Sequence, residues 1–254
     1  ISNTRALTAA HCWWDGRNQA RRFTLVFGSA RLFSGGTRLD TNTVQSHAGY
    51  NPNTLSNDVA MISFSPVSYT NVIQAVALPS GALLNSNFAG QWVRAAGYGR
   101  TSDSAGISQN QFQSHVSLQV ITNAVCAQSF GSIIVASTLC TSGAGAVGTC
   151  SGDSGGPLVS TSGNQRVLVR VRRHRVRMRP GLPALPFNAL VGVAGGRHVV
   201  RLVARLPGRL ALRLRPRHLL PVLDTSATLN TIHCLSTLYT IHDNKHFFLI
   251  IILL

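Results

Sequence analysis

A single octapeptide carries the most specific chemical signal in this sequence: Cys150-Ser151-Gly152-Asp153-Ser154-Gly155-Gly156-Pro157. Three glycines surround one serine and leave the backbone free to aim successive N–H groups at one point. An oxyanion hole needs that geometry, because its donors must converge on the oxygen where negative charge develops. A glycine-rich β-turn with an incidental serine is the simpler alternative, but it does not require the Asp, Cys and Pro at these spacings. The octapeptide therefore favours a loop that stabilises an oxyanion beside Ser154.

Two shorter motifs upstream supply a histidine and a carboxylate. In Thr8-Ala9-Ala10-His11-Cys12, small residues that allow close packing precede a His next to a Cys. In Asn57-Asp58-Val59-Ala60-Met61-Ile62, an Asp stands at the mouth of an apolar strand, where a partly desolvated carboxylate needs a donor such as an imidazole N–H. Taken alone, a single His is more often structural, and Asp58 is more often a capping or turn residue.

The pattern of apolar residues in the first 165 positions indicates an all-β fold. Short apolar or alternating runs recur between turn signals, and residues 115–121 place their apolar side chains on one face with a period of two. Only residues 123–129 are expected to form a short helix, starting from an Asn or Thr cap. Several short strands with glycine-rich loops predict a barrel or a sandwich. The expected strands are Phe23–Phe27, Val59–Phe64, Gln91–Ala96, His115–Ile121 and Pro157–Ser160.

Together, the three motifs resemble the chymotrypsin-like serine proteases (the trypsin and chymotrypsin family), in particular the insect digestive chymotrypsin type. His, Asp and Ser follow one another in that family's chain order. The resemblance covers about residues 2 to 168 and is supported by the stretches 50–58, 96–101 and 138–140. It implies an all-β fold of two antiparallel six-stranded β-barrels, incomplete in this chain.

The resemblance also implies a role for each motif residue. Ser154 is the expected nucleophile, His11 the base that takes its proton, and Asp58 the carboxylate that fixes the His11 tautomer. The N–H groups of Gly152 and Ser154 are expected to bind the oxyanion. In the family, Asp153 pairs with the α-amine released by activation cleavage. Ile1 is not expected to supply that amine.

Further expectations concern specificity and disulfides. Gly148 corresponds to the floor of the primary pocket, and it offers no carboxylate to hold a Lys or Arg side chain. A bulky aromatic or aliphatic P1 residue is therefore favoured. Cys126 and Cys140 resemble a family pair and are expected to form a disulfide. Cys12 and Cys150 lack their family partners.

The charge is divided unevenly along the chain. The whole sequence has a formal net charge of +16, but residues 1–165 hold eight Arg and five Asp, whereas residues 166–254 hold fourteen Arg, one Lys and two Asp. In the second part Arg alternates with Val and Leu, and no acidic residue occurs before Asp224. Such a segment lacks a pattern that could bury a core against the entropy of ordering its backbone.

We therefore divide the chain into an incomplete protease domain, residues 1–168, and an Arg-rich then apolar tail, residues 169–254. The tail lacks the strand, the cysteine and the closing helix that the family would place there, and a change of reading frame near residue 168 would explain its composition. The alternative is a basic polyanion-binding protein with a non-catalytic protease-like half. Arg-rich sequence binds nucleic acid or anionic lipid without specificity, so no specific nucleic acid or membrane partner is expected.

The remaining expectations concern processing, location and activity. Only ten residues precede His11, so we expect an N-terminally truncated chain, and the eight apolar residues at the end are too few to span a membrane. The resemblance implies a secreted, monomeric digestive endopeptidase with protein or peptide substrates, protein inhibitors as possible partners, and no cofactor or metal. His242 and His246 have a metal-compatible spacing, but chance explains it better. As written, the chain is expected to have little or no peptidase activity.

Overall fold

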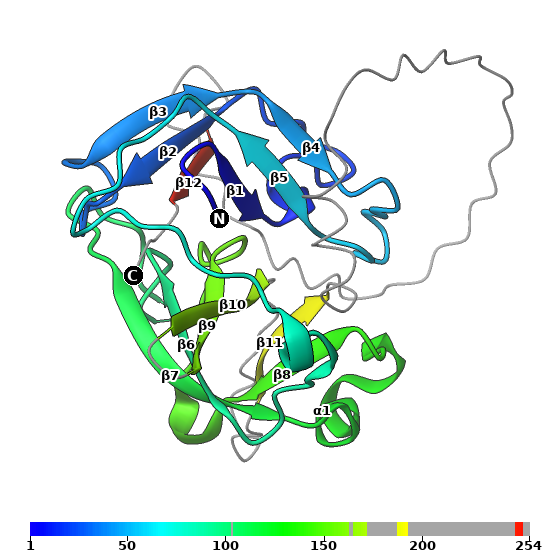
Figure 1. Ribbon diagram of the computed structural model, residues 1–254. Helices are drawn as coiled ribbons and strands as arrows, with labels where there is room; N and C mark the ends of the chain where they lie inside the picture. The colour runs from blue at the N-terminus through cyan, green and yellow to red at the C-terminus, as the bar shows by residue number, and fades with distance from the viewer. Residues whose placement is uncertain (103, 163–164, 172–186, 193–246, 251–254) are drawn as a thin grey trace, which may run out of the picture.

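The computed structural model describes residues 1–102, 104–162, 165–171, 187–192 and 247–250, and this part of the chain is built almost wholly of strands (Figure 1). One short α-helix and four 3-10 turns interrupt them. The strands are β1 (Arg5–Thr8), β2 (Phe23–Phe27), β3 (Thr37–Thr41), β4 (Val44–Ser46), β5 (Ala60–Ser63), β6 (Trp92–Gly97), β7 (Ser114–Ile121), β8 (Thr138–Ser142), β9 (Pro157–Ser162), β10 (Gln165–Val171), β11 (Phe187–Gly192) and β12 (Phe247–Ile250). The helix is α1 (Asn123–Phe130), and the turns are η1 (Ala10–Cys12), η2 (Gly81–Asn85), η3 (Gly131–Ile133) and η4 (Ala144–Ala146).

The strands form two halves, one above the other in Figure 1. The first half consists of two three-stranded sheets, ordered β1-β5-β4 and β12-β2-β3. The second half is one six-stranded sheet, ordered β10-β9-β6-β7-β8-β11. The expected all-β class is thereby confirmed, and neither half closes into a barrel among the described residues, which is consistent with the expected incompleteness.

The expected strands and helix are found at nearly the expected residues. In β7 the alternation is visible as burial, because Leu118 and Val120 are both 2% exposed whereas their neighbours in the strand are not buried. The helix α1 begins after Thr122, whose side chain accepts a hydrogen bond from the Val125 N–H. That bond satisfies one of the donors that a helix N-terminus otherwise leaves without a partner.

The sequence predicts no strand after residue 168, but the structure has strand segments at three places in that part of the chain. β10 continues to Val171 in antiparallel pairing with β9, β11 pairs antiparallel with β8, and β12 pairs with β2. The β12–β2 pairing is parallel, unlike every other pairing between named strands of the described residues. The physical reason is that an extended apolar segment of four to seven residues can satisfy the N–H and C=O groups along an open sheet edge even where the surrounding composition is unfavourable.

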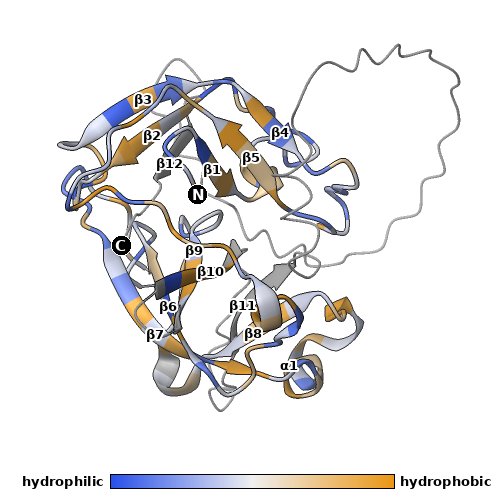
Figure 2. Cartoon of the chain, in the orientation of Figure 1, coloured by the Kyte–Doolittle hydropathy of each residue, from blue (hydrophilic) through white to orange (hydrophobic). Residues whose placement is uncertain are grey.

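Each half has its own apolar core, and a smaller cluster joins them. Figure 2 shows hydrophobic residues along β2 and β5, whose Phe23, Leu25 and Ile62 belong to the core of the first half. The second half packs around residues of β6 to β10, among them Leu118 and Leu158. The joining cluster contains Ala9, Val159 and Leu168 with partly buried Leu7, Cys12, Val76 and Leu78. Two of its members, Ala9 and Cys12, lie on either side of His11 in the sequence.

No helix among the described residues is long and apolar enough to cross a membrane.

Candidate active site

One strand pairing brings the histidine and aspartate motifs together. β1 and β5 are antiparallel, and their register places Thr8 opposite Ala60. His11 follows the end of β1 on η1, and Asp58 precedes the start of β5, so both residues lie beyond the same end of the pair. Residues separated by 47 positions in sequence become neighbours in this way.

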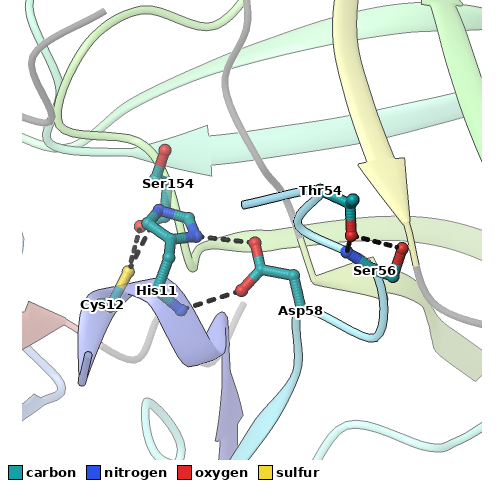
Figure 3. A network of polar contacts seen from close by, with 6 residues as sticks. All are labelled: His11, Cys12, Thr54, Ser56, Asp58 and Ser154. Carbon is teal, nitrogen blue, oxygen red and sulfur yellow. Dashed lines mark hydrogen bonds and ion pairs between the residues drawn. The ribbon is translucent and has the colours of Figure 1, made fainter. Parts of the chain in front are cut away.

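The aspartate carboxylate holds the histidine by two bonds, which Figure 3 draws as dashed lines. Asp58 Oδ2 lies 2.6 Å from His11 Nδ1, and Oδ1 accepts the His11 backbone N–H at 2.8 Å. Asp58 is only 3% exposed, so each oxygen replaces water with a fixed donor. An ionised carboxylate at Nδ1 requires the proton of the neutral imidazole to be on that nitrogen, which leaves Nε2 as the acceptor.

The serine of the octapeptide lies on the other side of the imidazole. Figure 3 shows the His11 ring between Ser154 and Asp58. The Cys12 sulfur marks how closely the segments approach, because it lies 3.7 Å from His11 Nε2 and 3.7 Å from the Ser154 carbonyl oxygen. Ser154 belongs to the loop before β9, in the second half, so the three residues come together at the junction between the halves.

The surroundings of His11 change its basicity. Burial alone lowers the pKa of His11, because desolvation disfavours the charged imidazolium. The neighbouring Cys12 sulfur and the Asp58 carboxylate act in the opposite direction and raise the pKa of His11 well above its usual value of 6.5. The imidazole is therefore a stronger base than an exposed histidine.

Backbone donors fix the loop that carries Ser154; we refer to residues 150–155 as the oxyanion turn. Asp153 Oδ1 accepts the Gly99 N–H at 2.9 Å, and Oδ2 accepts the Cys150 N–H at 2.9 Å. Gly152 and Gly155 have φ values of +96° and +82°, a region that glycine adopts at little cost. In this structure the α-amino group of Ile1 donates to the Arg5 carbonyl oxygen.

The other predicted residues occupy positions around this centre. Cys126 and Cys140 form a disulfide, with Cα atoms 6.3 Å apart, between α1 and β8. Gly148 lies in the segment before the oxyanion turn and is partly exposed. No cluster of three or more metal-ligating side chains occurs in the described part of the chain, and His242 and His246 lie outside it.

Sequence reasoning missed the role of two residues. Gly99 appeared only within a supporting stretch, although its N–H holds Asp153. Gln111 gave no signal, yet its side chain is buried and bonds to the Gly99 carbonyl oxygen. The Gly97-Tyr98-Gly99 sequence, with two glycines so close together, could have pointed to a close backbone approach.

The chain is similar in sequence to known proteins. The family described as Trypsin matches residues 1–181. Collagenase from Hypoderma lineatum is 38% identical over 165 residues, which cover 65% of this chain and 60% of the collagenase. Serine protease 1 from Drosophila melanogaster is 31% identical over 194 residues, covering 76% of this chain and 70% of the relative.

Among solved structures, that of HL collagenase is similar with a TM-score of 0.67 and 31% identity, and the likeness covers 82% of this chain and 85% of that one. The likeness therefore extends over both halves of the fold. The family match also continues past residue 168, through the end of β10.

Proposed function

The chain belongs to the trypsin family of serine proteases, and on that premise we propose that it is a serine endopeptidase whose triad is His11, Asp58 and Ser154. The observation that carries the proposal is the pair of hydrogen bonds that Asp58 makes with His11, one at Nδ1 and one at the backbone N–H. It leaves Nε2 as the acceptor on the side of the ring where Ser154 lies.

In the proposed reaction, Ser154 Oγ attacks the carbonyl carbon of the scissile bond while His11 Nε2 takes the hydroxyl proton. Asp58 stabilises the imidazolium that forms. The N–H groups of Gly152 and Ser154 bind the oxyanion of the tetrahedral intermediate. His11 then gives the proton to the leaving amine, and water repeats the sequence on the acyl-enzyme to release the acid.

The proposed specificity is for a bulky apolar or aromatic P1 residue. Gly148 at the pocket floor carries no charge to pair with Lys or Arg, and it leaves space for a large side chain. The proposed substrates are proteins or peptides. The disulfide between Cys126 and Cys140 supports an oxidising, extracellular location for the protein.

We further propose that turnover by this chain is low. The Cys12 thiol contacts Nε2 of His11 at 3.7 Å, and this is the nitrogen that must receive the Ser154 proton. A sulfur at that position competes with the serine hydroxyl for the base. The reaction requires the serine hydroxyl to be positioned on the base, so this competition lowers the population of reactive geometry.

An active-site-directed fluorophosphonate tests the triad without requiring rapid turnover. We expect the label on Ser154, loss of labelling in Ser154→Ala, and retained labelling in Ser151→Ala, which removes a hydroxyl from the same loop. Hydrolysis of peptide amides with Phe or Arg at P1 tests the pocket, and Phe is expected to be preferred. Absence of labelling together with salt-sensitive heparin or DNA binding would instead support a non-catalytic polyanion-binding protein.

A further inference from the structure

A buried glutamine lies next to the oxyanion turn but takes no part in the proposed chemistry. Gln111 is 8% exposed, an uncommon position for an amide side chain. Its Nε2 donates to the Gly99 carbonyl oxygen at 2.9 Å, and its Oε1 accepts the Ser108 N–H at 3.4 Å. A buried amide that lost such a partner would keep the cost of its desolvation, so these bonds hold the side chain in one orientation.

Gly99 connects this glutamine to the turn through its two backbone polar groups. Its carbonyl oxygen binds Gln111, and its N–H binds Asp153 at 2.9 Å. The approach is close, because a Cβ atom built on Gly99 would lie 2.6 Å from Asp153 Cγ, and one built on Gly152 would lie 3.1 Å from Gly99 Cα. The next residue, Arg100, donates its N–H to the Ser151 carbonyl oxygen at 2.9 Å. Movement of Gly99 would therefore displace the oxyanion turn.

The backbone of Gln111 is anchored to the first half of the molecule. Its carbonyl oxygen accepts the Leu32 N–H at 3.0 Å, and two residues later the Gln113 N–H donates to the Ala30 carbonyl oxygen at 2.9 Å. The guanidinium of Arg31 lies over the Phe112 ring, 4.3 Å from its centre. Gln111 thus stands between a loop of the first half and the turn of the second.

We infer that Gln111 is a positioning residue, which holds the N–H groups of Gly152 and Ser154 in place through Gly99 and Asp153. The inference rests on the proposed function, because it assigns these N–H groups to the oxyanion. The Gln111 amide touches neither substrate nor triad. Its effect is to keep Gly99 seated against Asp153, so that the donors are aimed before charge develops.

The test is the variant Gln111→Met, which keeps the length of the side chain and removes its donor. Gln119→Met is the matched control, because the Gln119 amide also donates to a backbone oxygen, that of Gly90 at 3.1 Å, but is exposed on β7. We expect Gln111→Met to lower kcat and the rate of fluorophosphonate labelling by about 10-fold, with KM within about 2-fold of the original, since the missing contact serves the transition state. The control is expected to leave all three values unchanged. Equal losses in both variants, or a loss confined to KM, would overturn the inference.

A second measurement does not depend on activity. Amide hydrogen exchange followed by mass spectrometry reports how often the peptide covering residues 150–155 opens. We expect faster exchange there in Gln111→Met and unchanged exchange in Gln119→Met, and unchanged exchange in both would overturn the inference. If the original chain does not label but its exchange still depends on Gln111, the proposed function fails while the positioning role stands.

Discussion

The two parts of the candidate active site are held by different means. The His11 side is fixed by an ionisable pair, in which one buried carboxylate bonds both the ring and the backbone of the histidine. The Ser154 side is fixed by the backbone N–H groups of Gly99 and Cys150, which donate to the Asp153 carboxylate. Glycines in this region leave no space for a side chain. The first part depends on charge and protonation, whereas the second depends on shape.

This difference predicts which substitutions each side tolerates. At the His11 side, a change that preserves shape but removes charge is severe, because the tautomer of the base depends on the carboxylate. At the oxyanion turn, the addition of one methyl group is severe even without a change in charge. Substitutions on the two sides therefore separate sensitivity to charge from sensitivity to shape.

The largest effect is expected from Asp58→Asn. The amide is nearly isosteric, but it can present an N–H to His11 Nδ1 and favour the wrong tautomer, so Nε2 no longer accepts the Ser154 proton. We expect the rate of fluorophosphonate labelling to fall by about 10⁴-fold, a magnitude taken from this family's own triad rather than obtained for this chain.

The matched control for the charge is Asp15→Asn. Asp15 lies four residues after His11, close enough for the two charges to interact, and it accepts N–H groups from Arg17 and Asn18 within a surface turn. Labelling of this variant is expected to stay within about 2-fold of the original, because these turn bonds do not involve the His11 ring. A similar loss in both variants would show that the Asp58 effect is not specific to the triad.

The next effect is expected from Gly99→Ala, which tests shape without charge. The new methyl group would lie 2.6 Å from Asp153 Cγ, so either the carboxylate or the 97–100 segment must move. We expect labelling to fall by about 10²-fold, because a displacement of the oxyanion donors by about 1 Å has that order of effect.

Gly106→Ala provides the control for Gly99→Ala. A Cβ atom on Gly106 would meet nothing within 4 Å, although this glycine lies in the loop that follows Gly99. Its labelling rate is expected to be unchanged. If Gly99→Ala labels as fast as Gly106→Ala, the close packing against Asp153 has no role in holding the turn.

The same contrast explains what the sequence could predict. His11, Asp58 and Ser154 lie in short motifs with distinctive neighbours, and the strand after Asp58 follows from its apolar run. The Gly99–Asp153 contact joins residues 54 positions apart and leaves no local pattern, so it becomes visible only in the folded chain. Gln111 is predicted to be a surface residue by composition alone, because burial of an amide depends on partners supplied by distant backbone.

The fold shows an equivalent limit. Alternation in residues 115–121 predicted a half-buried strand because period two is an intrinsic property of the β-conformation. The pairing of β12 with β2 could not be predicted, because four consecutive apolar residues specify neither a partner, a direction nor a register. Local patterns thus predicted elements, whereas edge pairings depended on the whole structure.

A smaller effect, on both the pH dependence and the plateau rate, is expected from Cys12→Ala. The Cys12 sulfur helps to raise the pKa of His11 against the opposing effect of burial. Its removal should lower that pKa. Since only neutral His11 accepts the Ser154 proton, the rate of labelling falls as pH decreases through the pKa of His11.

The acid limb of the pH–rate profile is therefore expected above pH 6.5 in the original chain and at lower pH in Cys12→Ala. Asp58 is retained in this variant, so the tautomer of the base is preserved. Loss of the competing thiol should also raise the plateau rate. An acid limb that does not move would show that Cys12 has no electrostatic influence on His11.

The smallest effect is expected from Thr122→Ala, which lies outside both parts of the site. The Thr122 hydroxyl accepts the Val125 N–H at the start of α1, and its loss should lower the free energy of unfolding by about 1 kcal/mol. Labelling of Ser154 should remain unchanged, because α1 packs against β8 rather than against the oxyanion turn. Ser129→Ala is the matched control, since it removes a hydroxyl from the exposed face of the same helix without removing the cap. Alanine has the higher helix propensity, so this control should not lose stability. Urea denaturation measures both values, and an equal loss in the two variants would mean that the cap at Thr122 contributes nothing specific to the start of the helix.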